Sequence, residues 1–348
     1  MSGQLAPFSD EQLRAAANLA QRYDAWADAI RQLDSLPSSM YYAARGEYEY
    51  LMVKRNSRDN GTSAGPRSAE TDARLAEYHA QRSMIQEAVA STERLLAENV
   101  AVFRSLKMPQ AMPKPGRFLR ELDLTGLLGN DVMAVGTNAF AVYQIEATAR
   151  FLNVADETED FDLAWCRDSH VSLAQRGEKR PKLMEVLRRI DKSFHINRRK
   201  PYQALDSEGY QVELLVAPSL FRTRPADDDF SPMATFPEQE WLLQGRPVRH
   251  VIVARDGKPV PIFAPDPRWM ALHKVWLSRK PDRNATKRKK DLQQGEILLH
   301  AVAERMQTSY PMDTNFVMDL PEELLPIFNE WASKNNFVPD GFGHPSIR

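Results

Sequence analysis

The chain has 348 residues, of which 43% are hydrophobic and 27% charged, a balance typical of a globular protein with one large or two to three modest domains. A formal net charge of −1 gives no overall attraction to nucleic acid, and a single cysteine excludes an internal disulfide and a cysteine-rich zinc site. The start of the chain lacks a signal-peptide pattern and no apolar run is long enough to cross a bilayer, so we expect a cytoplasmic protein with no membrane partner.

Two helix patterns dominate the N-terminal part of the chain. Ser9 and Gln12 have the spacing of a capping box, ahead of an amphipathic pattern that ends before Pro37. An uninterrupted pattern over residues 69–106 predicts one very long helix, which needs the first helix as a packing partner. Residues 54–67 between the two are polar and rich in turn residues, which is typical of a surface loop.

Residues 132–165 predict a strand, a tight turn, a helix and a second strand. An apolar strand over residues 132–135 ends at Gly136 and Thr137, and helical spacing follows over residues 139–151. A strand that ends in Gly-Thr before a helix directs backbone N–H groups and a hydroxyl to one place. That place suits a phosphate.

The second strand of this stretch carries two acids. Alternation along the strand directs Phe161 and Leu163 to one face and Asp160 and Asp162 to the other. Two carboxylates roughly 7 Å apart along a strand raise each other's cost of ionisation, and a divalent cation removes that cost. The alternative interpretation is an exposed edge strand with a solvated acidic face.

Further strands follow this acidic pair. Residues 194–196 and 210–216 read as antiparallel strands joined through a turn at residues 206–209, after a helix over residues 181–190. In the second strand, alternation separates Glu213 from the apolar face. A solvent-facing Glu213 on an edge strand is the alternative to a functional one.

The C-terminal part predicts a β-hairpin and several helices. Asp256-Gly257 lies between apolar runs, which is a strong hairpin signal, and Asp266-Pro267 is typical of a helix start. A basic run, residues 287–290, precedes a helix predicted from Asp291 to Arg305, and residues 320–337 predict a last helix. Taken alone, the basic run is a solvated face.

The turn Gly136-Thr137 followed by Asp160-x-Asp162 resembles the signature of the DNA polymerase β-like nucleotidyltransferase superfamily. The segments GTNAFAVYQIEA and TEDFDL are similar to a bacterial branch of nucleotidyltransferase-fold proteins, which is similar in turn to the abortive-infection toxin nucleotidyltransferases. The chain departs from the usual superfamily pattern in its longer gap between turn and first acid. A role in defence or as a toxin is an analogy with that related branch.

The resemblance implies an α+β fold. Its centre is a polymerase β-like nucleotidyltransferase core, a small mixed sheet with helices, which we place in residues 116–222. The core is flanked by an N-terminal helical hairpin with a basic loop in residues 1–115. A mostly helical region with a β-hairpin follows in residues 223–348.

The same resemblance implies the site residues. Asp160 and Asp162 match the metal-binding and catalytic acids, and Glu213 matches the third carboxylate, which is Asp in most members. The cofactor implied is Mg²⁺ or Mn²⁺. The implied nucleotide contacts are Gly136, Thr137, Asn138, Lys274, Lys290, Asp291 and Arg67, with Asp291 orienting one of the lysines and Arg67 on a segment that folds over the active site.

We therefore expect a metal-dependent nucleotidyltransferase that moves an NMP from an NTP to a hydroxyl of an RNA or tRNA, a protein or a small molecule. In the two-metal mechanism one ion binds the triphosphate, while the other lowers the pKa of the attacking hydroxyl as pyrophosphate leaves. The alternative is a non-catalytic nucleotide- or RNA-binding module on the same fold, and a plain scaffold is a third interpretation. The sequence leaves the acceptor, the NTP and the oligomeric state open.

Overall fold

The computed structural model describes residues 4–56, 59–152, 160–166, 181–223 and 235–341. The chain divides into two compact units. One consists of Met1–Ala16 with Phe103–Arg348, and the other of Ala17–Val102. The predicted division at residues 115 and 222 stays a prediction.

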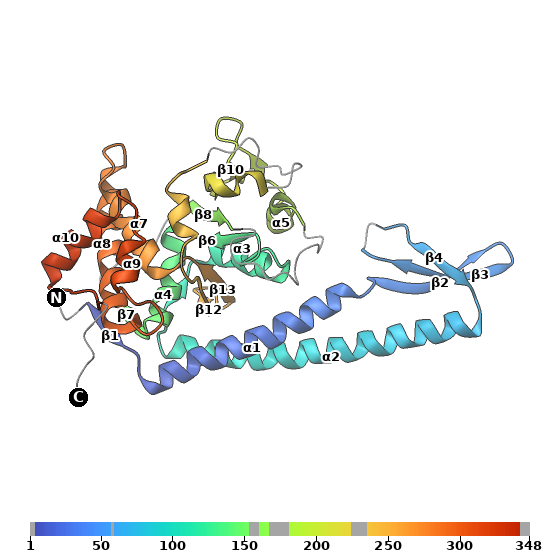
Figure 1. Ribbon diagram of the computed structural model, residues 1–348. Helices are drawn as coiled ribbons and strands as arrows, with labels where there is room; N and C mark the ends of the chain where they lie inside the picture. Colours follow the sequence, from blue (N-terminus) through green and yellow to red (C-terminus); the bar gives the residue numbers. More distant parts are fainter. Residues whose placement is uncertain (1–3, 57–58, 153–159, 167–180, 224–234, 342–348) are drawn as a thin grey trace. The chain divides into compact units, whose positions relative to one another are not determined.

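The smaller unit contains most of two long helices, which run antiparallel in Figure 1. α1 (Asp10–Ser35) begins at the predicted capping box, in which the Ser9 and Gln12 side chains each accept a hydrogen bond from the other residue's backbone N–H. α2 (Ala69–Ser105) confirms the predicted long helix. The Tyr78 hydroxyl donates to the Pro37 carbonyl at 3.0 Å, which ties the start of α2 to the chain just beyond α1.

A three-stranded antiparallel sheet lies between these helices in sequence. Its strands are β2 (Ser39–Arg45), β3 (Tyr48–Lys54) and β4 (Thr62–Pro66). The prediction of a loop over residues 54–67 is therefore wrong for its second half. β4 is an edge strand, where Gly65 at φ +127° and Pro66 are tolerated, and these two residues made the segment look like a turn. Met40, Leu51 and Tyr78 form the buried cluster under the sheet.

The larger unit is built around a mixed five-stranded sheet, which makes the fold α+β. Its order is β6-β8-β11-β10-β9, with β8 and β11 parallel and the other neighbours antiparallel. The strands are β6 (Val132–Ala134), β8 (Asp160–Trp165), β9 (His195–Ile196), β10 (Gln203–Leu205) and β11 (Gln211–Leu215).

One face of this sheet is the core, as the alternation predicted. Phe161 and Leu163 on β8 and Val212 and Leu214 on β11 have no exposed surface. Phe118 of α3 (Pro113–Leu124) stacks on Phe161 with ring centroids 5.8 Å apart. α5 (Leu183–Ile190) confirms the helix predicted over residues 181–190 and contacts α3. The acidic face of β8 therefore lies on the opposite side of the sheet from this core.

The predicted helix over residues 139–151 is too long. α4 (Phe140–Glu146) ends where Thr148 takes φ +51°, and β7 (Ala149–Phe151) then pairs with β1 (Leu5–Pro7). The pairing partner lies far away in sequence, so local spacing gave no sign of it. The predicted pairing of residues 194–196 with residues 210–216 is also wrong, because β10 lies between β9 and β11 and pairs with both.

The rest of the larger unit is helical with a small sheet. The predicted hairpin is confirmed, and a third strand joins it in the order β13-β12-β5. The elements are β5 (Gln110–Ala111), α6 (Gln239–Leu242), β12 (Val248–Ala254), β13 (Pro259–Ala264), α7 (Pro267–Ser278), α8 (Ala285–Ala301), α9 (Thr314–Met318) and α10 (Leu325–Asn335). The predicted last helix is shorter than residues 320–337, since it begins at Leu325.

α7 and α8 pack closely along their lengths. A Cβ on Gly295 of α8 would lie 2.8 Å from the Ala271 carbonyl oxygen of α7, so only glycine permits this approach. α8 begins at Ala285 rather than at Asp291, because Asn284 caps it by accepting from the backbone N–H groups of Thr286 and Lys287. The basic run therefore belongs to the first turns of a helix.

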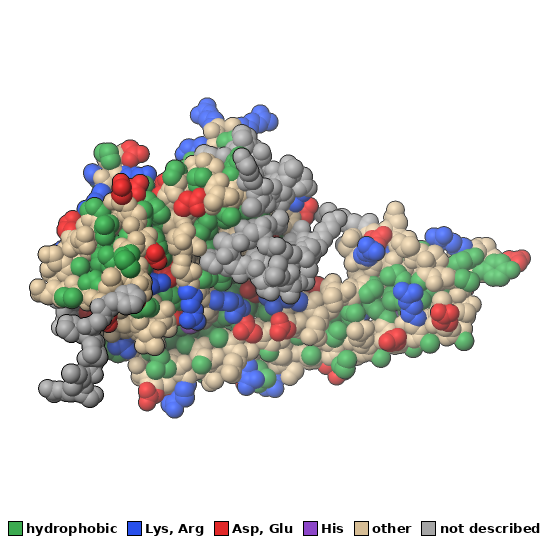
Figure 2. Space-filling model, viewed as in Figure 1, with side chains coloured by type: hydrophobic (Ala, Val, Ile, Leu, Met, Phe, Trp, Pro, Cys, Tyr) green, Lys and Arg blue, Asp and Glu red, His purple; other side chains and the backbone are tan. Residues whose placement is uncertain are grey.

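In the part of the chain that the structure describes, no helix has both the length and the apolar character needed to cross a membrane. The visible faces of the two long helices carry acidic and basic side chains side by side rather than a patch of one sign (Figure 2). This distribution agrees with the formal net charge of −1.

Candidate active site

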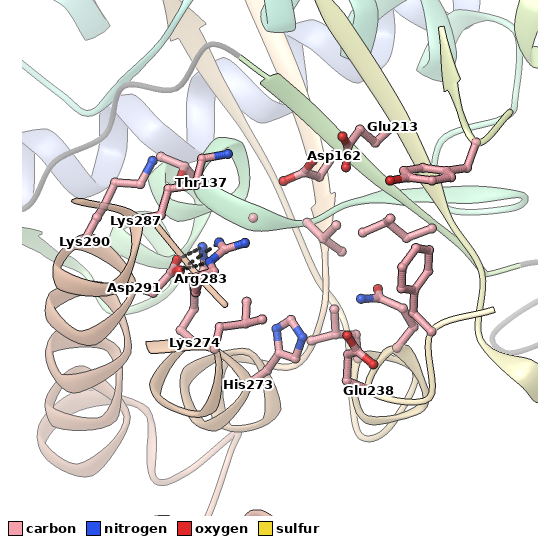
Figure 3. Close-up of a pocket in the computed structure, with 18 residues that line it drawn as sticks. Thr137, Asp162, Glu213, Glu238, His273, Lys274, Arg283, Lys287, Lys290 and Asp291 are labelled. Atoms are coloured by element: carbon pink, nitrogen blue, oxygen red, sulfur yellow. Dashed lines mark hydrogen bonds and ion pairs between the residues drawn. The ribbon is translucent and has the colours of Figure 1, made fainter. Parts of the chain in front are cut away.

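A cavity of about 280 Å³ lies in the larger unit, bounded by β8, β11, the turn after β6, and helices α6, α7 and α8 (Figure 3). It brings together residues that are far apart in sequence. The predicted site residues that line it are Gly136, Thr137, Asp162, Glu213, Lys274, Lys290 and Asp291.

Two carboxylates lie on neighbouring parallel strands at one wall of the cavity. Glu213 on β11 is the register partner of Asp162 on β8, so both side chains leave the sheet on the same face, as Figure 3 shows. The buried Gln203 on β10 donates from its side-chain amide to the Glu213 carboxylate, and Asn197 donates to Gln203 at 2.9 Å. Glu213 is thus held in place from the next strand. The backbone of Asp160 belongs to β8, while its side chain lies outside the described part.

The turn after β6 folds directly onto Asp162. The Val135 N–H donates to the Asp162 carbonyl at 3.1 Å, and Gly136 then takes φ +70°. A Cβ on Gly136 would lie 2.5 Å from Oδ2 of Asp162. Glycine is required here on two grounds, the left-handed backbone and the contact with the carboxylate. Thr137, which is buried, follows at the cavity wall.

We expect Gly136→Ala to impair both the fold and the activity, because the new methyl group must displace the Asp162 carboxylate or open the turn. Gly209→Ala is the matched control: Gly209 has φ +82° but nothing within 4 Å of its added Cβ. The control should lose about 1–2 kcal/mol of stability from backbone strain. Gly136→Ala should lose more in chemical denaturation, together with most NMP transfer. Equal losses for the two variants would show that contact with Asp162 plays no part.

The opposite wall of the cavity is basic. Lys287 and Lys290 extend from the first turns of α8 toward Thr137 (Figure 3). The N-terminal end of a helix carries a partial positive charge from its backbone N–H groups, which adds to these ammonium groups. The arrangement favours a multiply charged anion between α8 and the Gly136-Thr137 turn.

A buried ion cluster lies beneath this basic wall. Oδ1 of Asp291 accepts from Nζ of Lys274 at 2.8 Å, and Oδ2 lies 2.7 Å from NH2 of Arg283. Asp291 has no exposed surface and Lys274 is buried. Burial by itself raises the pKa of Asp291, but the two cations and their hydrogen bonds outweigh it, so its pKa is below the ordinary value. The cluster fixes the end of α7 to the start of α8.

The remaining wall is formed by α6, α7 and the segments before β10 and α6. Glu238 and His273 lie here, on the side away from Lys287 and Lys290 in Figure 3. The Tyr202 and Phe236 rings meet edge to face with centroids 5.6 Å apart. Burial raises the pKa of Tyr202, and the nearby Glu213 carboxylate raises it further, so Tyr202 stays a neutral hydroxyl.

No group of three or more His, Cys, Asp or Glu side chains suited to a metal ion occurs among the described residues. The described pair, Asp162 and Glu213, supplies carboxylate oxygens only, the ligand type that hard cations such as Mg²⁺ prefer. The third predicted ligand is Asp160, whose side chain is outside the described part.

Comparison with known proteins adds one finding to this geometry. A family model described as nucleotidyltransferase matches residues 114–317, a range that is more than half of the chain and includes every residue given above as lining the cavity. The chain belongs to this nucleotidyltransferase family. No curated protein and no solved structure matches it.

The protein is therefore an enzyme, and its family implies an NTP substrate. This result favours the predicted transferase over the non-catalytic binding module and the plain scaffold. Nucleotidyltransferases generally use divalent metal ions, which is consistent with carboxylates at the cavity wall. The catalytic and binding roles of the individual residues remain predictions.

Apart from Asp160, whose side chain is outside the described part, two predicted site residues of the nucleotidyltransferase are not among those that line the cavity. Asn138 lies in the turn after β6 but not at the cavity wall. Arg67 belongs to the smaller unit, where it pairs with Glu49 at 2.7 Å and Asp72 at 3.3 Å and lies over the Tyr42 ring. Its predicted contact with the nucleotide stays a prediction.

Several residues that line the cavity are not among the predicted site residues, including Arg283, Lys287, Glu238, Gln239 and His273. Arg283 directly precedes Asn284, the N-cap of α8, and the start of α8 therefore brings it to the cavity wall. Gln239 carries no local signal, and only the packing of α6 against α7 brings Gln239 and His273 to one wall.

Proposed function

We propose that this enzyme transfers an NMP from an NTP to an acceptor hydroxyl in a divalent-metal-dependent reaction within the cavity. The observation that carries the proposal is the register pairing of Asp162 with Glu213, with the Gly136 turn folded against the Asp162 carboxylate. This arrangement joins an acidic wall to a turn that suits a phosphate. It also supports a polymerase β-like core, in which acids on neighbouring strands of a small mixed sheet carry the chemistry.

The residues present fit a divalent cation. Asp162 and Glu213, with Asp160 as the third member, would hold Mg²⁺ or Mn²⁺ through carboxylate oxygens. Such an ion supplies charge neutralisation at the triphosphate and makes the acceptor hydroxyl more acidic. Gln203 orients Glu213 through its amide donor and leaves the carboxylate otherwise directed at the cavity.

The chain's own cations would bind the triphosphate. Thr137 would contribute its hydroxyl and backbone N–H, while Lys287 and Lys290 would neutralise charge that develops on the leaving pyrophosphate. This proposal gives Lys274 a role that differs from the predicted direct contact with the triphosphate. Its ammonium is engaged by the buried Asp291, so in this proposal Lys274 and Asp291 together position Arg283 at the cavity wall.

The acceptor is proposed only as a class, a hydroxyl of RNA or tRNA, of a protein or of a small molecule. The link to the abortive-infection toxin branch rests on the resemblance of the Gly136-Thr137 and Asp160-x-Asp162 segments. The three-part division at residues 115 and 222 is likewise a proposal. The family match begins at residue 114 and supports the first of these boundaries, but it runs through the second.

The test is transfer of label from each α-³²P-labelled NTP to cell RNA, to cell protein or to neither. We expect label in one fraction with Mg²⁺ or Mn²⁺, none with excess EDTA, and recovery when the metal is restored, because the acid wall alone cannot neutralise a triphosphate. Label that persists in EDTA would contradict the metal-dependent mechanism. The labelled fraction would name the acceptor class.

A further inference from the structure

Two residues of the cavity wall that α6 and α7 form, Gln239 and His273, carry polar atoms without a partner. Oε1 of Gln239 and both ring nitrogens of His273 are buried and have no hydrogen-bond partner among the described residues. Gln239 is 4% exposed and His273 is 6% exposed, and both line the cavity. Leaving buried polar atoms unpaired costs about 1–3 kcal/mol each, so a ligand that pairs with them is favoured.

These atoms offer mainly hydrogen-bond acceptors. Burial, helped by the positive charge of Lys274, lowers the pKa of His273 to about 3. The ring is therefore neutral at pH 7, with one N–H donor and one acceptor nitrogen. Oε1 of Gln239 and the carboxylate of Glu238, which lines the same wall, accept only.

The surroundings of these acceptors suit a flat, neutral ring rather than a phosphate. The carboxylate of Glu238 repels a phosphate, although Lys280 lies 3.3 Å from it. Tyr202, Phe236 and the apolar side chains of Leu215, Leu242 and Leu277 complete the wall. A cavity that is basic at α8 and aromatic, apolar and acceptor-rich at α6 has the polarity of a nucleoside triphosphate.

We propose that the α6–α7 wall binds the base of the NTP and selects bases that carry an exocyclic amino group, through Gln239, His273 and Glu238. This inference rests on the proposed function. Adenine, cytosine and guanine each present an amino donor. Uracil has no amino group and presents a carbonyl oxygen where cytosine carries one. That oxygen would face Oε1 of Gln239 and the Glu238 carboxylate, which only accept, and would leave the His273 N–H as the donor among these three groups.

The test is calorimetric binding of ATP, CTP, GTP, UTP and tripolyphosphate to the full chain, with Ca²⁺ in place of Mg²⁺ to slow turnover. We expect UTP to bind at least about tenfold more weakly than the best amino-bearing nucleotide, since one hydrogen bond is lost and one acceptor is left unpaired. In Gln239→Met and in His273→Phe, the ratio of the two affinities should fall toward one. Neither should alter tripolyphosphate binding.

Gln244→Met is the matched control, because Gln244 follows α6 but is exposed and does not line the cavity. Equal affinity for UTP and the other NTPs in the wild-type protein would overturn the proposal. So would a preference that survives in both Gln239→Met and His273→Phe. If one variant fails to fold, the other decides, since the two substitutions lie on different helices.

A second experiment tests whether the base bound by the α6–α7 wall belongs to the NTP or to an RNA acceptor. The same variants are titrated with a short single-stranded RNA, the form in which an acceptor would present a base. Loss of RNA binding with unchanged NTP selectivity would overturn the assignment to the NTP. Failure of the proposed function would give a different result. Tripolyphosphate would then bind equally well with and without the divalent ion, and the preference among bases would be unaffected.

Discussion

Replacing Asp162 with Asn is expected to lower the rate of NMP transfer by at least about a thousandfold, because the metal ion that this carboxylate holds in the proposed mechanism would be worth several kcal/mol in the transition state. The fold should persist. Asn has nearly the same shape, and removing one of two neighbouring negative charges beside Glu213 relieves repulsion in the metal-free protein. The melting temperature of the metal-free variant should therefore equal or exceed that of the wild type.

A binding measurement separates this expectation from a structural defect. Mg²⁺ should raise the melting temperature of the wild-type protein, since a ligand of the folded state stabilises it, and this rise should vanish in Asp162→Asn. Asp319→Asn is the control, because Asp319 is an exposed aspartate away from the cavity, and it should retain both activity and the Mg²⁺ response. An active Asp162→Asn enzyme would exclude the proposed mechanism.

Replacing Asp291 with Asn is expected to destabilise the protein by about 3–5 kcal/mol, since it leaves the cations of Lys274 and Arg283 without their buried counter-charge. The corresponding fall in melting temperature is on the order of 10 °C. Urea denaturation measures the change directly. NMP transfer should also fall, because Arg283 loses the partner that holds it at the cavity wall.

Glu330→Gln provides the contrast for this variant. Glu330 pairs with Arg279 at 2.8 Å, but both side chains are exposed, so breaking that pair should cost no more than about 1 kcal/mol. An equally small loss for Asp291→Asn would show that the buried cluster does not hold α7 and α8 together.

The contribution of Asp291 should also depend on pH with a definite sign. Its pKa is lowered in the folded protein, so the folded state binds its proton less readily than the unfolded chain. The stabilisation is complete above about pH 4 and is lost as the pH falls through the folded-state pKa. The difference in stability between wild type and Asp291→Asn should therefore shrink below about pH 4.

Local patterns in the sequence determined which elements form and which faces they bury. The capping box at Ser9, the cap at Asp266 and the hairpin turn at Asp256-Gly257 all depend on neighbours within a few residues, and all are present. The alternation that buries Phe161 and Leu163 is confirmed for the same reason, because a strand's two faces are fixed by its period of two.

Contacts between distant segments, in contrast, could be seen only in the folded chain. Helical spacing over residues 139–151 was overridden by pairing of β7 with β1, and β10 was inserted between two strands that the sequence paired directly. Strand pairing depends on partners that no local window contains. The sequence likewise supplied Asp162 and Glu213 as candidates, but their register is a property of the sheet.

The residues around the cavity also include some that local sequence indicates and others that meet only in the folded chain. Lys274 and Asp291 are 17 residues apart, and their buried contact exists because Gly295 lets α7 and α8 approach each other. Gln239 and His273 became a candidate base-binding wall only through the packing of α6 on α7. The acids and the glycine turn could be predicted from local sequence, since their chemistry depends on neighbouring residues. Their contact partners could not be predicted in this way, because burial and contact between distant residues arise only when the chain is folded.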